Sequence, residues 1–160
     1  MKILRTLLMV GLITASLQAQ TRPAPLGQAS ITWLYYKDVP AAMRFYEDIL
    51  GLTLTVDQGW AKVYQTSPTS FIGLVDEARG MHRASETKPV AVAFVTPDVD
   101  AWHGWLVSRG VKMRSAVADS KSLPIRGFTA YDPEGYTLEF ETFRDDPQNT
   151  KMRALLKAPK

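Results

Sequence analysis

The chain has 160 residues, of which 46% are hydrophobic and 22% are charged, which is the size and composition of one folded domain. The absence of cysteine excludes disulfide frameworks, thiolate zinc sites, iron–sulfur clusters and cysteine nucleophiles, and the presence of only two histidines excludes a three-histidine metal site within one chain. The formal net charge is +3.

The N-terminus predicts export. Residues 1–5 carry two positive charges, residues 6–17 form an apolar run, and Ala19 is a small residue at the expected cleavage position. These features are typical of a secretory signal peptide over residues 1–19, and a linker with two prolines and a glycine follows over residues 20–29. The alternative is a membrane anchor, but the apolar run is shorter than the roughly 20 residues of a spanning helix. We expect a periplasmic or secreted protein that is free of the membrane after cleavage. Loss of Lys2 and Arg5 on cleavage would lower the 19 basic residues to 17 against 16 acidic ones, and the resulting net charge of +1 does not favour nucleic acid as a partner.

The first half of the folded part predicts a strand, a helix and three further strands. β-branched and aromatic residues over 30–36 are typical of a strand. Asp38 is an expected helix N-cap, apolar residues recur at helical spacing over 42–50, and Gly51 is an expected helix end. Strand-like segments follow at residues 52–56, 60–65 and 71–75.

The second half repeats this order. A strand is expected at 90–95, an N-cap at Asp98, a helix whose apolar face includes Trp102 and Trp105, and a helix end at Gly110. Strand-like segments follow at residues 111–115, 127–131 and 136–143. The dipeptide Asp-Val recurs at 38 and 98, 60 residues apart, which indicates a duplicated unit. The predicted fold is therefore α+β: two tandem βαβββ units over residues 30–144 forming a cupped mixed sheet with helices outside. Residues 145–160 are expected to form a polar tail with a short helix around 150–156.

Three motifs resemble the vicinal oxygen chelate superfamily, which includes glyoxalase I, extradiol dioxygenases and bleomycin-resistance proteins. They are Tyr-Lys-Asp-Val at 36–39, Phe-Tyr-Glu-Asp-Ile-Leu-Gly-Leu at 45–52 and Asp-Pro-Glu-Gly-Tyr-Thr-Leu-Glu-Phe at 132–140. The resemblance covers about residues 31–143 and implies the duplicated fold. It does not imply one activity, because the superfamily includes isomerases, dioxygenases and resistance proteins that only bind their ligand.

The resemblance also implies where metal ligands would lie, namely on the first and last strand of each unit. The corresponding positions here are Ile31, Gly73, Ala91 and Glu139, and only Glu139 can coordinate a metal. A catalytic metal needs about three protein ligands and an open position, so we expect no metal and no other cofactor. The alternative is a divalent metal at a displaced site that uses His82 with Glu139.

Strand alternation predicts which residues line the cup. The inward residues are expected to be aromatic on the first strand, small on the neighbouring strands and acidic on the last strand. Small residues leave room for a ligand, and aromatic walls suit a flat apolar molecule. Two further residues are expected near the cup: His82, in the loop between the units, and Arg126, at the start of a strand at the rim. The predicted ligand-binding residues are Trp33, Tyr35, Phe71, His82, Ala93, Arg126, Glu139 and Glu141. In an alternative interpretation, the aromatic residues fill the cup as core.

Three functions are compatible with this pattern. The first is an exported, metal-free protein that binds a small, largely apolar or aromatic molecule. The second is a lyase, isomerase or dioxygenase in which Glu139 is the catalytic residue, with a displaced metal or without one. The third is an interaction module whose cup has collapsed. A homodimer is also expected, because short strands leave sheet edges that need covering.

Overall fold

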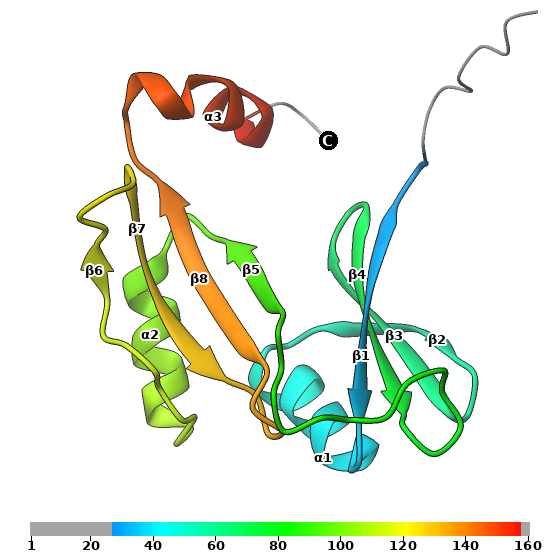
Figure 1. The fold of residues 1–160 in the computed structure, drawn as a ribbon. Coiled ribbons are helices and arrows are strands. Elements are labelled where there is room, and N and C mark those ends of the chain that lie inside the picture. Colours follow the sequence, from blue (N-terminus) through cyan, green and yellow to red (C-terminus); the bar gives the residue numbers. More distant parts are fainter. Residues whose placement is uncertain (1–26, 158–160) are drawn as a thin grey trace, which may run out of the picture.

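The computed structural model describes residues 27–157. The predicted signal peptide and most of the predicted linker lie outside the described residues. The described chain forms two βαβββ units in succession, followed by a C-terminal helix (Figure 1). The predicted α+β class and the duplication are confirmed.

The first unit contains a four-stranded sheet in the order β1-β4-β3-β2, with β1 and β4 parallel and the other pairs antiparallel. The Asp38 side chain caps the helix by accepting a hydrogen bond from the Ala41 N–H at 2.9 Å. The helix then widens into a π-helical turn and ends at Gly51, whose φ of 68° is in the left-handed region. The elements are β1 (Ser30–Tyr36), α1 (Val39–Arg44), η1 (Phe45–Ile49), β2 (Thr53–Asp57), β3 (Ala61–Ser67) and β4 (Ser70–Asp76).

The second unit repeats this arrangement with the strand order β5-β8-β7-β6. Asp98 caps its helix by accepting from the Ala101 N–H at 3.0 Å, and Gly110 ends the helix with a φ of 70°. The elements are β5 (Ala91–Val95), α2 (Val99–Ser108), β6 (Ala118–Asp119), β7 (Ile125–Tyr131) and β8 (Thr137–Phe143). The sheet of the first unit is called sheet A below, and that of the second unit sheet B.

The prediction of a strand at residues 111–115 is wrong. Only Met113 pairs there, in an isolated bridge with Ala130, and the fourth strand of sheet B is instead the short β6. The Val111 N–H donates to the Leu106 carbonyl at the end of α2, so it takes no part in a ladder. The next N–H groups, at residues 114 and 115, both donate to the carbonyl of Thr129, which interrupts the regular alternation of a strand.

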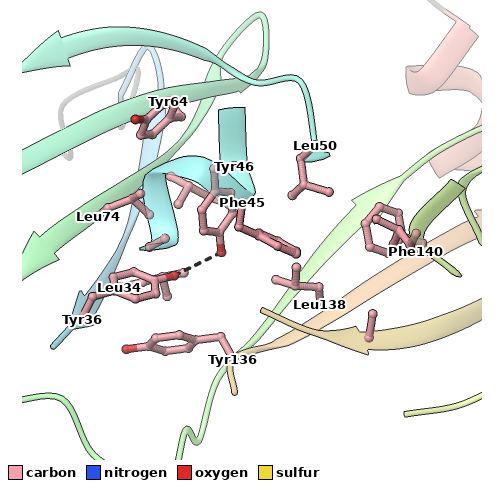
Figure 2. Close-up of a cluster of buried hydrophobic side chains, with 14 of the residues drawn as sticks. Leu34, Tyr36, Phe45, Tyr46, Leu50, Tyr64, Leu74, Tyr136, Leu138 and Phe140 are labelled. Atoms are coloured by element: carbon pink, nitrogen blue, oxygen red, sulfur yellow. Dashed lines mark hydrogen bonds between the residues drawn. The ribbon is translucent and has the colours of Figure 1, made fainter. Parts of the chain in front are cut away.

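The two sheets do not merge into one. Among the described residues, β1 and β5 are the end strands of sheets A and B, and no strand pair joins them. One hydrophobic core nevertheless spans both units (Figure 2). Phe45 and Leu50 from the helical segment of the first unit lie towards Leu138 and Phe140 of β8. The two units therefore share one folded body, although each has its own sheet.

The junction between the units is built around the buried carboxylate of Asp132, which is 5% exposed. Its Oδ2 accepts hydrogen bonds from the hydroxyls of Tyr36, at 2.7 Å, and Tyr46, at 3.4 Å. Its Oδ1 accepts from the backbone N–H groups of Glu134, at 3.0 Å, and Tyr136, at 2.8 Å. Burial raises the pKa of Asp132, while the hydrogen bonds from the Tyr36 hydroxyl and from the two backbone N–H groups oppose the rise. The turn of the second unit is thus tied to β1 and η1 of the first.

A second set of contacts strengthens this junction. The Tyr136 hydroxyl accepts from the Tyr35 N–H at 2.9 Å and donates to the Tyr35 carbonyl at 3.0 Å. One oxygen of Glu134 accepts from the N–H groups of Lys37 and Asp38, at 2.6 and 2.8 Å, just before α1. Both tyrosine and glutamate belong to the Asp-Pro-Glu-Gly-Tyr turn, so this sequence motif serves the packing of the two units.

A C-terminal segment outside the two units begins with η2 (Pro147–Asn149) and ends with α3 (Thr150–Lys157). Asn149 is buried and donates to the carbonyls of Pro124, at 2.7 Å, and Arg144, at 2.9 Å. These bonds attach the segment to sheet B (Figure 1). Within residues 27–157, no helix has the length and apolar character to cross a membrane.

Candidate functional site

The inner face of sheet B carries two glutamates side by side. Glu139 and Glu141 alternate along β8 with Leu138 and Phe140, which are buried in the core on the opposite face. Across the ladder, Glu139 is paired with Ala93 of β5. The inward orientation of Glu139 and Glu141 therefore follows from the burial of their neighbours.

The two glutamates line a concavity of about 250 Å³ on this face. Its other walls come from β6, β7 and the segment before β6, including Ser115, Ile125 and Thr129. Burial raises the pKa of Glu141, and the neighbouring charge of Glu139 raises it further. Within the described part of the chain, neither glutamate forms an ion pair or a side-chain hydrogen bond.

Arg126 is placed on the other side of sheet B from the glutamates. Its guanidinium forms an ion pair with Asp100 of α2 at 2.8 Å and lies 3.6 Å from Asp119 of β6. Asp119 is also 3.1 Å from Arg144. Arg126 therefore binds α2 and the edge of sheet B and is not brought together with Glu139.

The inner face of sheet A carries the predicted aromatic residues. Trp33 of β1 is paired with Gly73 of β4, and its indole lies across this glycine. A Cβ atom at residue 73 would lie 2.1 Å from the Trp33 Cε3, far inside van der Waals contact. The small residue was expected to leave room for a ligand, but the structure fills that space with the Trp33 ring. Trp33 therefore packs onto its own sheet, although a side chain that is 42% exposed is not a core residue.

Tyr35 and His82 are brought together on the same face. Their rings meet edge to face with centroids 5.1 Å apart. Gly80 allows this approach, because a Cβ there would lie 2.5 Å from Val75 Cγ1 and 2.8 Å from Tyr35 Cε1. The loop between the units thus presses onto the end of β1, and the exposed His82 covers the Tyr35 ring.

The predicted site residues consequently form two groups. Trp33, Tyr35, Phe71 and His82 belong to sheet A and its loop, whereas Ala93, Glu139 and Glu141 belong to sheet B. The concavity that holds the glutamates is not lined by any of the four residues of the first group. Sequence alternation predicts the face of each side chain, but it does not predict the distance between two sheets.

The donor set does not fit the metal that the fold implies. Three of the four corresponding positions, Ile31, Gly73 and Ala91, have no coordinating side chain. Among residues 27–157, no group of three or more histidine, cysteine, aspartate or glutamate side chains is arranged to hold a metal ion. Glu139 alone would supply too few ligands for a divalent ion.

A larger pocket, of about 430 Å³, lies between the two units, and of the predicted ligand-binding residues only Ala93 lines it. It is lined by the segment after η1, the β3–β4 turn, β5, α2 and α3, with Leu50, Ser67, Val95, Trp102 and Leu156 among its residues. Trp102, on the predicted apolar face of the helix, packs against Phe140 with ring centroids 5.7 Å apart and also faces this pocket. Because segments far apart in the sequence form the pocket, no local pattern indicates it.

The apolar face predicted for this helix also included Trp105, which we expected to be buried in the core, and the structure corrects this. Its side chain is 38% exposed and donates from Nε1 to the Ile49 carbonyl at 2.7 Å. The Arg109 guanidinium covers the ring, with its Cζ 4.0 Å from the ring centroid. Trp105 therefore links α2 to the first unit at the surface.

Comparison with known protein families and solved structures agrees with the duplicated fold described above. The model of the Glyoxalase/Bleomycin resistance protein/Dioxygenase superfamily matches residues 27–140, so the chain belongs to this superfamily. No curated protein matches the sequence significantly.

Solved structures show the same fold at low identity. Lactoylglutathione lyase from Agrobacterium tumefaciens is 18% identical, with a TM-score of 0.60 over 75% of this chain and 96% of that chain. TioX from Micromonospora sp. ML1 is 18% identical, with a TM-score of 0.62 over 73% of this chain and 99% of that chain. A glyoxalase/bleomycin resistance protein/dioxygenase from Nocardioides is 23% identical, with a TM-score of 0.60 over 81% of this chain and 89% of that chain. These similarities establish the fold and leave the activity open.

Proposed function

We propose that this protein is an exported, metal-free binder of a small, flat and largely apolar molecule that carries a hydrogen-bond donor or a positive charge. The ligand would occupy the concavity on sheet B, with its donor at Glu139 and Glu141. The observation that carries this proposal is the pair of carboxylates without ionic partners on a concave face.

The chemistry of the concavity supports this ligand class. A carboxylate that leaves water needs a donor or a positive charge, and burial already raises the pKa of Glu141. The third carboxylate at the rim, Asp119, is neutralised by Arg126 and Arg144. Ile125 and the small residues Ala116 and Ala118 supply apolar surface beside the two glutamates. A ligand amine would therefore meet Glu139 and Glu141, while its apolar part would lie against β7.

Replacement of Glu139 by glutamine should weaken the binding of an aromatic amine about tenfold. A hydrogen bond that involves a charge contributes about 1.5–3 kcal/mol, and about 1.4 kcal/mol corresponds to one decade of affinity. We suggest isothermal titration with tryptamine as the probe. The free energy of unfolding should stay equal or rise slightly, because a partly buried carboxylate carries a desolvation cost.

The matched control is Glu86→Gln, because Glu86 is exposed in the loop between the units and outside the concavity. It should bind tryptamine as the wild type does. Equal affinities of the wild type and Glu139→Gln would contradict the proposed role of Glu139. Stoichiometric zinc, nickel, iron or manganese in protein purified without chelators would instead favour the enzyme alternative with a displaced metal site.

We also propose a homodimer that covers the inner face of sheet A. Ile31, Trp33 and Val56 on this face are 44%, 42% and 44% exposed, which is unusual for large apolar side chains that lie on one face. Light scattering at high micromolar concentration should give the dimer mass for the wild type. Ile31→Lys should shift the mass towards the monomer, because burial of an unpaired charge is costly.

Val107→Lys is the control for this experiment, since Val107 is 51% exposed on α2, on the outside of sheet B. It should leave the dimer intact. A monomer mass for the wild type at high concentration would refute the homodimer without affecting the proposed ligand site.

A further inference from the structure

The pocket between the two units has the properties of a second binding site. Its volume of about 430 Å³ falls within the roughly 300–1,000 Å³ of small-molecule sites. Large apolar side chains from several elements form its walls: Leu50 and Leu52 after η1, Trp102 of α2 and Phe140 of β8. It shares only Phe140 with the concavity that holds Glu139, although its residues Ala93 and Val95 are the strand partners of Glu139 and Glu141.

The polar groups of this pocket are uncharged. Among the described residues that line it, none has an ionisable side chain. Hydroxyl groups come from Thr66, Ser67 and Ser70 around the β3–β4 turn and from Thr96 at the end of β5. A charged ligand would lose its hydration here without gaining an opposite charge. The lining therefore favours a neutral molecule, in contrast to the carboxylate-bearing concavity on sheet B.

β5 adds backbone donors and acceptors to the pocket. The strand lies at the end of sheet B, and β8 is its only partner within the described chain. The Thr96 N–H donates to the Glu141 carbonyl on β8 at 2.9 Å. Because successive residues of a strand direct their backbone groups to opposite edges, those of Ala93 and Val95 point away from β8. Both residues line the pocket, so an N–H and a carbonyl of an unpaired strand edge are available to a ligand there.

The C-terminal helix α3 closes one side of the pocket through a single residue. Leu156 contributes to the lining and is 44% exposed, whereas the adjacent Leu155 is 71% exposed and does not line the pocket. The helix is held in position by the buried Asn149 and by the bond from Arg153 to the Phe143 carbonyl at 3.1 Å. The hydrogen bonds of Asn149 and Arg153 thus hold Leu156 over the pocket, and neither of these two residues lines the pocket.

We propose that this pocket binds an uncharged, mainly apolar small molecule that carries an amide or amine N–H. The apolar part would lie between Leu50, Trp102 and Leu156, and the N–H would donate to a backbone carbonyl on the free edge of β5. This site is separate from the proposed carboxylate site, and neither proposal depends on the other.

The test uses the full-length protein and N-phenyl-1-naphthylamine, a neutral aromatic amine whose fluorescence rises in apolar surroundings. The wild type should bind it saturably at one equivalent per chain. Leu156→Ala should weaken the binding about threefold to tenfold, because it removes part of the apolar surface that covers the ligand. Leu155→Ala is the matched control on the same helix and should bind as the wild type does. Ser67→Phe should abolish binding by filling the pocket.

Three outcomes would overturn the proposal. The first is equal affinity of the wild type, Leu156→Ala and Leu155→Ala. The second is weaker binding in Glu139→Gln, which would place the probe at the carboxylate concavity. The third is binding to the monomer that disappears in the dimer, which would assign the pocket to a second copy of the chain. Leu156→Ala alters only a partly exposed side chain, so the test remains valid if Ser67→Phe fails to fold.

Discussion

Replacement of Asp132 by alanine should lower the free energy of unfolding by about 3–5 kcal/mol, since each buried donor left without a partner costs about 1–3 kcal/mol. The carboxylate accepts from two tyrosine hydroxyls and two backbone N–H groups. The hydroxyls of Tyr36 and Tyr46 lie 3.2 Å apart and can bond to each other, so three of these four donors would lose their acceptor. Because Tyr36 and Tyr46 belong to the first unit, the loss would also loosen the junction between the units. Urea denaturation followed by circular dichroism measures the effect.

Asp132→Asn is the matched control and should cost only about 1 kcal/mol, because it keeps the acceptor of both N–H groups and leaves a single hydroxyl hydrogen unpaired. The Asn Oδ1 can still accept from the N–H groups of Glu134 and Tyr136. Its Nδ2 can donate to the hydroxyl of Tyr36, which then acts as an acceptor. If Asp132→Ala proved as stable as Asp132→Asn, the hydrogen bonds at this junction would have no part in stability.

The difference in unfolding free energy between the wild type and Asp132→Asn should depend on pH, and its direction follows from the shift in the pKa of Asp132. Burial raises the pKa of Asp132 above its ordinary value of 3.8, so the folded state favours the protonated form. The contribution of Asp132 to stability is therefore complete below 3.8 and declines as the pH rises through the raised pKa. The unfolding free energy of the wild type minus that of Asp132→Asn should fall over this interval and then become constant. A difference that grows with pH would contradict the buried position of the carboxylate.

The sequence predicts the fold well because the signals that specify it are local. The caps Asp38 and Asp98 and the helix-ending glycines Gly51 and Gly110 stand where the structure uses them. The strand expected at residues 111–115 is reduced to one bridge with β7, because the Val111 N–H bonds to the end of α2 and the N–H groups of residues 114 and 115 share the Thr129 carbonyl. Backbone hydrogen bonding to distant segments is not visible in a local pattern.

The candidate site is predicted less completely, for a different reason. Alternation assigns Glu139 and Trp33 each to an inner face, and both faces are as expected. Whether the two faces form one cup depends on how sheets A and B sit, which is set by Asp132, Glu134 and Tyr136 at the junction. The position of Arg126 follows from a pairing with Asp100 that lies 26 residues away in the sequence. The sequence pattern shows which chemical groups are present, but it does not predict which distant residues they will pair with.

Replacement of Gly73 by alanine should destabilise the protein by about 1–3 kcal/mol, the usual cost of forcing extra atoms into a packed site. The added Cβ would lie 2.1 Å from Cε3 and 2.4 Å from Cζ3 of Trp33, so the indole must leave the surface of sheet A. In a Trp33→Ala background the same substitution should cost less than about 0.5 kcal/mol, because the clashing ring is gone and alanine restricts the unfolded chain more than glycine does. The measurement is a double-mutant cycle of urea unfolding, with an expected coupling energy of at least about 1 kcal/mol.

Gly104→Ala controls for the general effect of removing a glycine, since nothing lies within 4 Å of a Cβ at that position on α2. It should stabilise the protein by about 0.5–1 kcal/mol, the usual difference between the two residues inside a helix. If Gly73→Ala cost the same with and without Trp33, the indole would not lie across β4. The aromatic side chain would then be free to act as a wall for a ligand, as the alternation alone suggests. A large coupling energy would instead mean that Trp33 packs on its own sheet, which would leave the glutamates of sheet B as the polar centre of the ligand site.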